Sequence, residues 1–121
     1  MKRVLIFVLS VNDSVYAPMM RNSMDTWDSE GCEGTETVYY HGMPMVEESL
    51  RVVSFPVLED YNTISAKNLF AFAWALKKPW DYMARVNASC FVHKRRLRDY
   101  VQDLPEKGLI RGVIADPTEH C

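Results

Sequence analysis

The sequence has little of several features that restrict function. Its 121 residues include 14 basic and 16 acidic side chains, so no excess charge draws the chain to nucleic acid or to an anionic membrane. Three cysteines, at positions 32, 90 and 121, are too few and too scattered for a disulfide scaffold or a clustered zinc site. We therefore expect a chain of a reducing, cytoplasmic compartment, with a small molecule or a protein as its partner.

Long apolar runs and the commonest enzyme motifs are also missing. No stretch approaches the roughly 20 apolar residues that cross a bilayer, so no membrane partner is expected. The apolar start of the chain is interrupted at Ser10 and lacks a small-residue cleavage pattern, which favours a buried first strand over a signal peptide. The motifs GxGxxG, GxxxxGK[ST] and GxSxG do not occur, which excludes the commonest dinucleotide, P-loop and hydrolase signatures.

Short apolar runs do alternate with amphipathic segments. Strands are predicted at 3–9, 35–40, 50–55, 81–86 and 109–115, and helices from about 18 to 27, 63 to 78 and 93 to 104. Residues 41–48 are expected to form a loop, and Pro56 is expected to end the third strand. The order predicts a single α/β domain over 1–121, with a mostly parallel sheet flanked by helices in a Rossmann-like three-layer sandwich.

The helix predicted at 63–78 is apolar nearly all round in its second half. Such a helix is expected to be buried on more than one side. Asn62 or Thr63 is expected to cap its start by accepting a hydrogen bond from a first-turn amide.

Polar residues follow two strands that are expected to be neighbours in the sheet. Ser10 to Ser14 follow the first strand, and Asn87 to Ser89 follow the fourth. Because ligands of parallel sheets sit beyond the carboxyl ends of the strands, these residues are expected to meet at one edge and to bind there.

A basic cluster lies further along, formed by His93, Lys94, Arg95, Arg96 and Arg98. Such a run can hold a phosphate, but more often it is a solvated helix face. The surrounding chain lacks the interleaved aromatic residues typical of nucleic-acid binding, so no nucleic-acid partner is expected.

Two stretches carry a pattern that is similar to a known family. The first begins Tyr61-Asn62-Thr63-Ile64-Ser65-Ala66-Lys67-Asn68-Leu69 and continues as an apolar helix. The second runs Trp80-Asp81-Tyr82-Met83-Ala84-Arg85-Val86-Asn87-Ala88-Ser89-Cys90-Phe91-Val92. Together they resemble the β-1,3-galactosyltransferase-like glycosyltransferases of the GT-A fold, whose pattern is roughly Y-x-N-L-T-x-K-T, a helix ending in W-x, and a strand K-x-D-x-D-x-F-V. The first strand and residues 97–112 continue the likeness.

The resemblance implies a domain that binds a nucleotide-diphosphate sugar, with a UDP-sugar as the expected donor. Lys67 matches the lysine of the family's capped helix, and Asn87 and Ser89 match the two acids of the Asp-x-Asp motif. In the family those acids hold Mn²⁺ or Mg²⁺, which neutralises charge on the leaving group. Neutral side chains are poor ligands for a hard dication, so binding without a metal is expected. The expected nucleotide-sugar-binding residues are Ser10, Asn12, Asp13, Lys67, Arg85, Asn87 and Ser89.

The family places its acceptor site and general base in a further stretch of roughly a hundred residues beyond this motif. The chain is therefore expected to be either a fragment lacking the acceptor half, inactive alone, or a short form that binds without turnover. Without that half, the apolar helix predicted at 63–78 would have no second layer packed on it, so an exposed apolar patch or a homo-oligomer is expected. The alternative is a non-catalytic α/β binding module for a nucleotide or a protein. A flavodoxin-like or receiver-like domain is disfavoured, because the acidic cluster and late lysine of receivers are absent.

Overall fold

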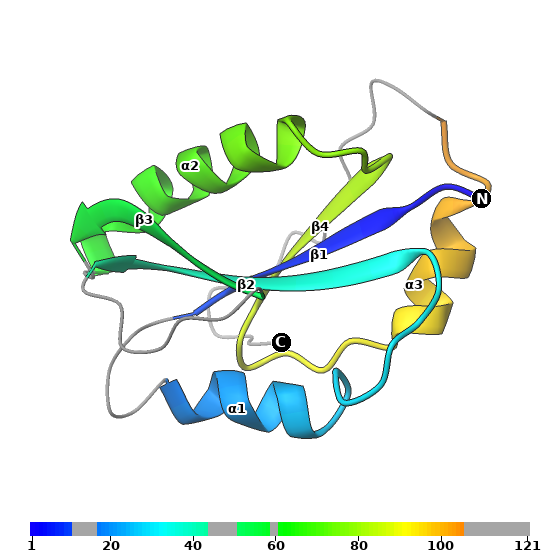
Figure 1. Cartoon of the computed structure of the whole chain (residues 1–121), viewed down its shortest axis with the longest axis horizontal. Helices are drawn as coiled ribbons and strands as arrows, with labels where there is room; N and C mark the ends of the chain where they lie inside the picture. The colour runs from blue at the N-terminus through cyan, green and yellow to red at the C-terminus, as the bar shows by residue number, and fades with distance from the viewer. Residues whose placement is uncertain (11–16, 44–50, 59–60, 106–121) are drawn as a thin grey trace, which may run out of the picture.

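The computed structural model describes residues 1–10, 17–43, 51–58 and 61–105 (Figure 1). Strands and helices alternate in the described residues, except that β3 follows β2 directly in the element order, and a short 3₁₀ turn, Tyr61–Thr63, leads into the second helix. The elements are β1 (Val4–Leu9), α1 (Ala17–Asp25), β2 (Thr35–Met43), β3 (Val52–Leu58), α2 (Ile64–Leu76), β4 (Tyr82–Asn87) and α3 (Lys94–Val101).

The four strands form one parallel sheet in the order β3-β2-β1-β4. The central strand β1 pairs with β2 on one side and with β4 on the other, so that Leu9 lies beside both Tyr40 and Asn87. All six residues of β1 are buried. A continuous apolar run suits such a position, because both faces of a central parallel strand are covered.

Helices cover both faces of the sheet (Figure 1). The helix α2 packs on the side chains of one face, including Leu5, Phe7 and Tyr40, through Ala71 and Trp74. The helices α1 and α3 pack on the opposite face, where the core consists of Val4, Ile6, Val8, Met20, Tyr39, Val52 and Val101. The predicted α/β class, with a parallel sheet flanked by helices in three layers, is confirmed.

Two predicted strand boundaries are wrong. The structure extends β2 through Met43, so residues 41–43 belong to a strand and not to a loop. The strand β3 continues past Pro56 to Leu58. Proline is tolerated there because β3 is an edge strand of the sheet that the described residues form, and the register with β2 shifts between His41 and Met43, opposite this part of β3. The strand predicted at 109–115 lies outside the described residues.

The helix α2 departs from expectation at its start and on its outer side. Thr63 is the N-cap residue, but its side chain makes no capping hydrogen bond. Burial on more than one side is also wrong in the described part of the chain, because one side of α2 packs on the sheet and the outer side is open. The exposed apolar patch that was expected is confirmed: Leu69 is 69 %, Phe70 41 %, Phe72 41 % and Leu76 86 % exposed. None of the described helices is long and apolar enough to cross a membrane.

Candidate functional site

The strand order creates a switch point between β1 and β4. From β1 the chain adds β2 and β3 on one side, and it returns through α2 to place β4 on the other side. At the carboxyl ends of these strands, the Ala88 amide donates to the Leu9 carbonyl at 3.1 Å, and the Ser10 amide donates to the Tyr40 carbonyl at 2.8 Å. Ser10 and the Asn87–Ser89 turn therefore meet at one edge, as predicted. Asn12 and Asp13 lie outside the described residues.

Ser10 presents an unsatisfied hydroxyl at this edge. The residue is 2 % exposed, and its Oγ has no hydrogen-bond partner among the described residues. A buried polar atom without a partner costs about 1–3 kcal/mol, so such an atom at a switch point is a candidate ligand contact.

Arg85 belongs to a short hydrogen-bond chain under α2. Its Nε donates to the Tyr40 hydroxyl at 3.3 Å, and that hydroxyl donates to Asn68 Oδ1 at 2.6 Å. Burial raises the pKa of Tyr40, while the hydrogen bond and charge of Arg85 act in the opposite direction. The chain of bonds orients the Arg85 side chain. Sequence reasoning missed both partners of Arg85: Tyr40 lies outside the two stretches that resemble the family, and Asn68 lies in the first of them but had no role assigned to it.

The sheet separates the predicted site residues. Along β1, Leu9 packs on the α2 side and Val8 on the α1 and α3 side, so the next residue, Ser10, belongs to the α1 and α3 side. Met83 packs under α2, whereas Ala84 and Val86 pack on the α1 and α3 side, so alternation along β4 places Arg85 and Asn87 on the α2 side. Ser89, by contrast, lines a pocket of about 300 Å³ beside α1. Asn87 and Ser89 are both exposed.

Lys67 lies on α2 and differs from the exposed residues at the edge. It is 1 % exposed and already has an interaction partner. Its ammonium group is therefore not presented at the surface of the described structure.

The residues at the edge do not fit the divalent ion that the resemblance implies. Asn87 and Ser89 offer neutral oxygens, whereas Mn²⁺ and Mg²⁺ prefer carboxylates. Among the described residues, no group of three or more His, Cys, Asp and Glu side chains is placed to hold a metal ion. We therefore assign no role to a metal at this edge.

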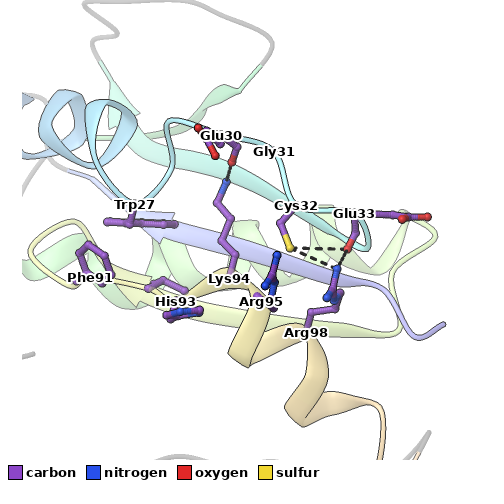
Figure 2. Close-up of a pocket in the computed structure, with 11 residues that line it drawn as sticks. Trp27, Glu30, Gly31, Cys32, Glu33, Phe91, His93, Lys94, Arg95 and Arg98 are labelled. Atoms are coloured by element: carbon purple, nitrogen blue, oxygen red, sulfur yellow. Dashed lines mark hydrogen bonds between the residues drawn. The ribbon is translucent and has the colours of Figure 1, made fainter.

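A larger pocket, of about 530 Å³, lies between the end of α1 and the start of α3 (Figure 2). It is on the opposite face of the sheet from α2, and four members of the basic sequence cluster contribute to it. The lining residues are Trp27, Glu30, Gly31, Cys32, Glu33, Phe91, Val92, His93, Lys94, Arg95 and Arg98. The cluster is thus more than a solvated helix face. The helical period could have indicated this, because Arg95 and Arg98 are three residues apart and share one side of α3.

A buried ionic network lies directly behind this pocket. The Asp28 carboxylate pairs with Arg51 and with Lys94, whose Nζ is 2.5 Å from Oδ1, and it accepts a hydrogen bond from the Tyr39 hydroxyl at 2.7 Å. Burial lowers the pKa of Lys94, with Arg51 adding to the decrease and Cys32 opposing it. Burial also raises the pKa of Tyr39. No sequence motif marked Asp28, because its partners come from distant segments.

No protein-family model, curated protein or solved structure matches the chain significantly. The resemblance to glycosyltransferases therefore rests on the sequence pattern alone, and the fold class rests on the structure.

Proposed function

We propose that this chain is a glycosyltransferase-like binding domain for a nucleotide-diphosphate sugar, and that a UDP-sugar occupies the switch point between β1 and β4. The observation that supports this most directly is the buried, unpartnered Ser10 hydroxyl beside the Asn87–Ser89 turn. A parallel sheet binds its ligands at such an edge, and the sequence pattern around Asn87 favours a sugar nucleotide there.

Each group at the edge has a chemical role in this proposal. Arg85 supplies a positive charge for the diphosphate, while its hydrogen bond to Tyr40 limits the side-chain freedom that is lost on binding. Ser10 and Asn87 offer hydroxyl and amide groups to ribose, sugar or phosphate oxygens. Lys67 and the residues Asn12 and Asp13 remain candidates from the sequence pattern. Because Arg85 is the main positive charge that contacts the diphosphate, binding is weak, decreases with salt and needs no metal.

Catalysis is a separate question from binding. Hexosyl transfer requires an acceptor site and a general base, and we assign neither to the described residues. We therefore propose binding without turnover for the 121-residue chain.

Calorimetric titration with uridine diphosphate, in the presence of EDTA, tests the proposal. A charge-assisted hydrogen bond contributes about 1.5–3 kcal/mol, so Arg85→Gln is expected to weaken binding about tenfold or more. Asn87→Ala is expected to weaken binding by a smaller factor. Arg96→Gln is the matched control, since Arg96 is an exposed arginine on α3 and should leave binding unchanged.

Two results would contradict the proposal. One is binding that appears only with Mn²⁺, and the other is equal affinity of the parent, Arg85→Gln and Asn87→Ala. If uridine diphosphate does not bind under any condition, the alternative of a non-catalytic module for a protein partner is favoured.

The outer side of α2 supports a second proposal, that the chain forms a homo-oligomer. Leu69 and Leu76 are 69 % and 86 % exposed on one short helix, and clustered exposed apolar side chains mark association surfaces. Light scattering over a range of concentrations should show a species heavier than 14.0 kDa, and the double variant Leu69→Gln, Leu76→Gln should shift it toward the monomer. A parent chain that stays monomeric at the highest concentration would exclude this proposal.

A further inference from the structure

The pocket between α1 and α3 has a cationic end with unused donors. Arg95 and Arg98 both line the pocket and extend from α3 toward residues 31–33, while the Glu33 side chain extends away from them (Figure 2). Arg98 donates through Nη1 to the Glu33 carbonyl at 3.1 Å and through Nε to Asp99 at 3.2 Å. Arg95 makes no hydrogen bond or ion pair with any described residue. An anion could therefore bind both guanidinium groups.

The start of α3 is electrostatically unfavourable without such an anion. Lys94, Arg95 and Arg96 occupy the first turn, which contains no acidic residue. Helix N-termini carry partial positive charge and are stabilised by anions, so three cations there repel the helix dipole and each other. Lys94 has Asp28 as its buried counter-ion, whereas Arg95 and Arg96 have none in the described part of the chain. A phosphate beside Arg95 would offset this repulsion.

The opposite end of the pocket is aromatic. Trp27 follows α1 and Phe91 follows β4, and both rings lie at the end of the pocket away from the arginines (Figure 2). Phe91 is 73 % exposed, which is high for a phenylalanine. Flat bases stack on such rings with about 1–3 kcal/mol per base.

His93 also lines the pocket. Its Nδ1 accepts a hydrogen bond from the Arg96 amide at 3.3 Å and caps α3. In the neutral ring the proton then resides on Nε2, which can donate to a sugar or phosphate oxygen.

We propose that this pocket binds a nucleoside monophosphate, with the base against Trp27 and Phe91 and the phosphate between Arg95 and Arg98. The volume of about 530 Å³ is larger than a phosphate ion needs and lies within the range of about 300–1,000 Å³ that is typical of small-molecule sites. Arg85 and Asn87 of the proposed nucleotide-sugar edge lie on the other, α2 side of the sheet, whereas Ser89 lines a neighbouring pocket that shares Trp27 and Phe91 with this one.

The test is titration of the isotope-labelled full chain with adenosine 5′-monophosphate, followed by chemical shifts of the backbone amides and of the Trp27 indole. Adenosine and inorganic phosphate are titrated separately as the two halves of the probe. We expect the monophosphate to bind at least about tenfold more tightly than either half, because each half engages one end of the pocket. The shifted signals should come from residues 27–33 and 91–98.

Arg95→Glu is the decisive variant, since the exposed Arg95 side chain makes no described contact that folding requires. It should weaken the monophosphate about tenfold or more. Arg96→Glu is the matched control, because it makes the same charge change at the next residue of the same turn, outside the pocket lining. It should retain at least half of the parent affinity. Binding of uridine diphosphate should persist in Arg95→Glu, so the two proposals can fail separately.

Three outcomes would overturn the inference. Equal loss in Arg95→Glu and Arg96→Glu would indicate a diffuse charge effect and not a pocket. Inorganic phosphate binding as tightly as the monophosphate would remove the role of the aromatic end. Shifts confined to Ser10 and residues 85–89 would place the nucleotide at the sheet edge, which would support the proposed function alone.

Discussion

Replacing Asp28 with asparagine should destabilise the fold strongly, because it removes the anion of a buried ionic network. The Asp28 side chain is 1 % exposed, and its carboxylate faces Arg51 and Lys94. An asparagine keeps an oxygen that can accept the Tyr39 hydroxyl bond, so the change mainly removes the charge. The Lys94 side chain, only 10 % exposed, is then left without its buried counter-ion, whereas Arg51, 43 % exposed, can be solvated.

The magnitude follows from that difference in exposure. Removing one partner of a buried ion pair costs about 3–5 kcal/mol. Because water compensates much of the Arg51 charge, we take the lower end of this range, about 3 kcal/mol, for Asp28→Asn. With roughly 2.1 cal/mol/K per residue, the 121 residues have an unfolding entropy of about 0.25 kcal/mol/K, so Tm should fall by about 12 °C.

Urea denaturation of the parent and variants measures this effect. Asp99→Asn is the matched control: Asp99 is 63 % exposed and pairs with Arg98 at 3.2 Å, so its loss should cost less than about 1 kcal/mol. Lys94→Met should destabilise the parent but stabilise the Asp28→Asn variant, because it removes the unpaired charge. The reasoning is refuted if Asp28→Asn and Asp99→Asn unfold at the same urea concentration. It is also refuted if Lys94→Met changes the unfolding free energy in the same direction in the parent and in the Asp28→Asn variant.

Two further predictions concern the turn before β2 and the buried tyrosines. Gly34 has a φ of 86°, and an added Cβ would lie 3.1 Å from Arg98 Cδ, so Gly34→Ala should cost about 1–2 kcal/mol in urea denaturation. Gly31→Ala, where a Cβ meets nothing within 4 Å, should cost little, and equal costs would contradict the strain argument. Burial raises the pKa of Tyr39 and Tyr40, so above pH of about 10 the folded chain binds more protons than the unfolded chain. The unfolding free energy should therefore fall as pH rises beyond about 10. Tyrosinate absorbance should appear together with unfolding. Tyrosinate absorbance that appears while the fold is still intact would contradict this prediction.

The parallel sheet could be predicted from the sequence because its signals are local. The uninterrupted apolar run of β1 indicates a strand that is buried on both faces. The succession of strands and helices along the chain indicates a parallel sheet covered by helices. The continuation of β3 past Pro56 could not be predicted, because it depends on β3 being the edge strand. For the same reason the outer side of α2 was misjudged: an apolar helix surface does not indicate how many layers cover it.

The candidate site was predicted only where the order of the strands is enough to bring residues together. Ser10 follows β1 and Asn87 is the last residue of β4, so their meeting required only that these two strands be neighbours in the sheet. Asp28 meets Tyr39, Arg51 and Lys94 from three separate segments, and no spacing in the sequence encodes that encounter.

The basic run at the start of α3 shows how one stretch of like charges can divide into different roles. Lys94 precedes Leu97 and Val101 at helical spacing, which turns its ammonium inward to Asp28 while those two side chains enter the core. Arg95 and Arg98, three residues apart, turn toward the pocket. Arg96 is exposed on the remaining side of α3, away from both the core and the pocket. A charge reversal should therefore change stability at Lys94, change ligand affinity at Arg95 and change neither at Arg96, although the three residues are consecutive.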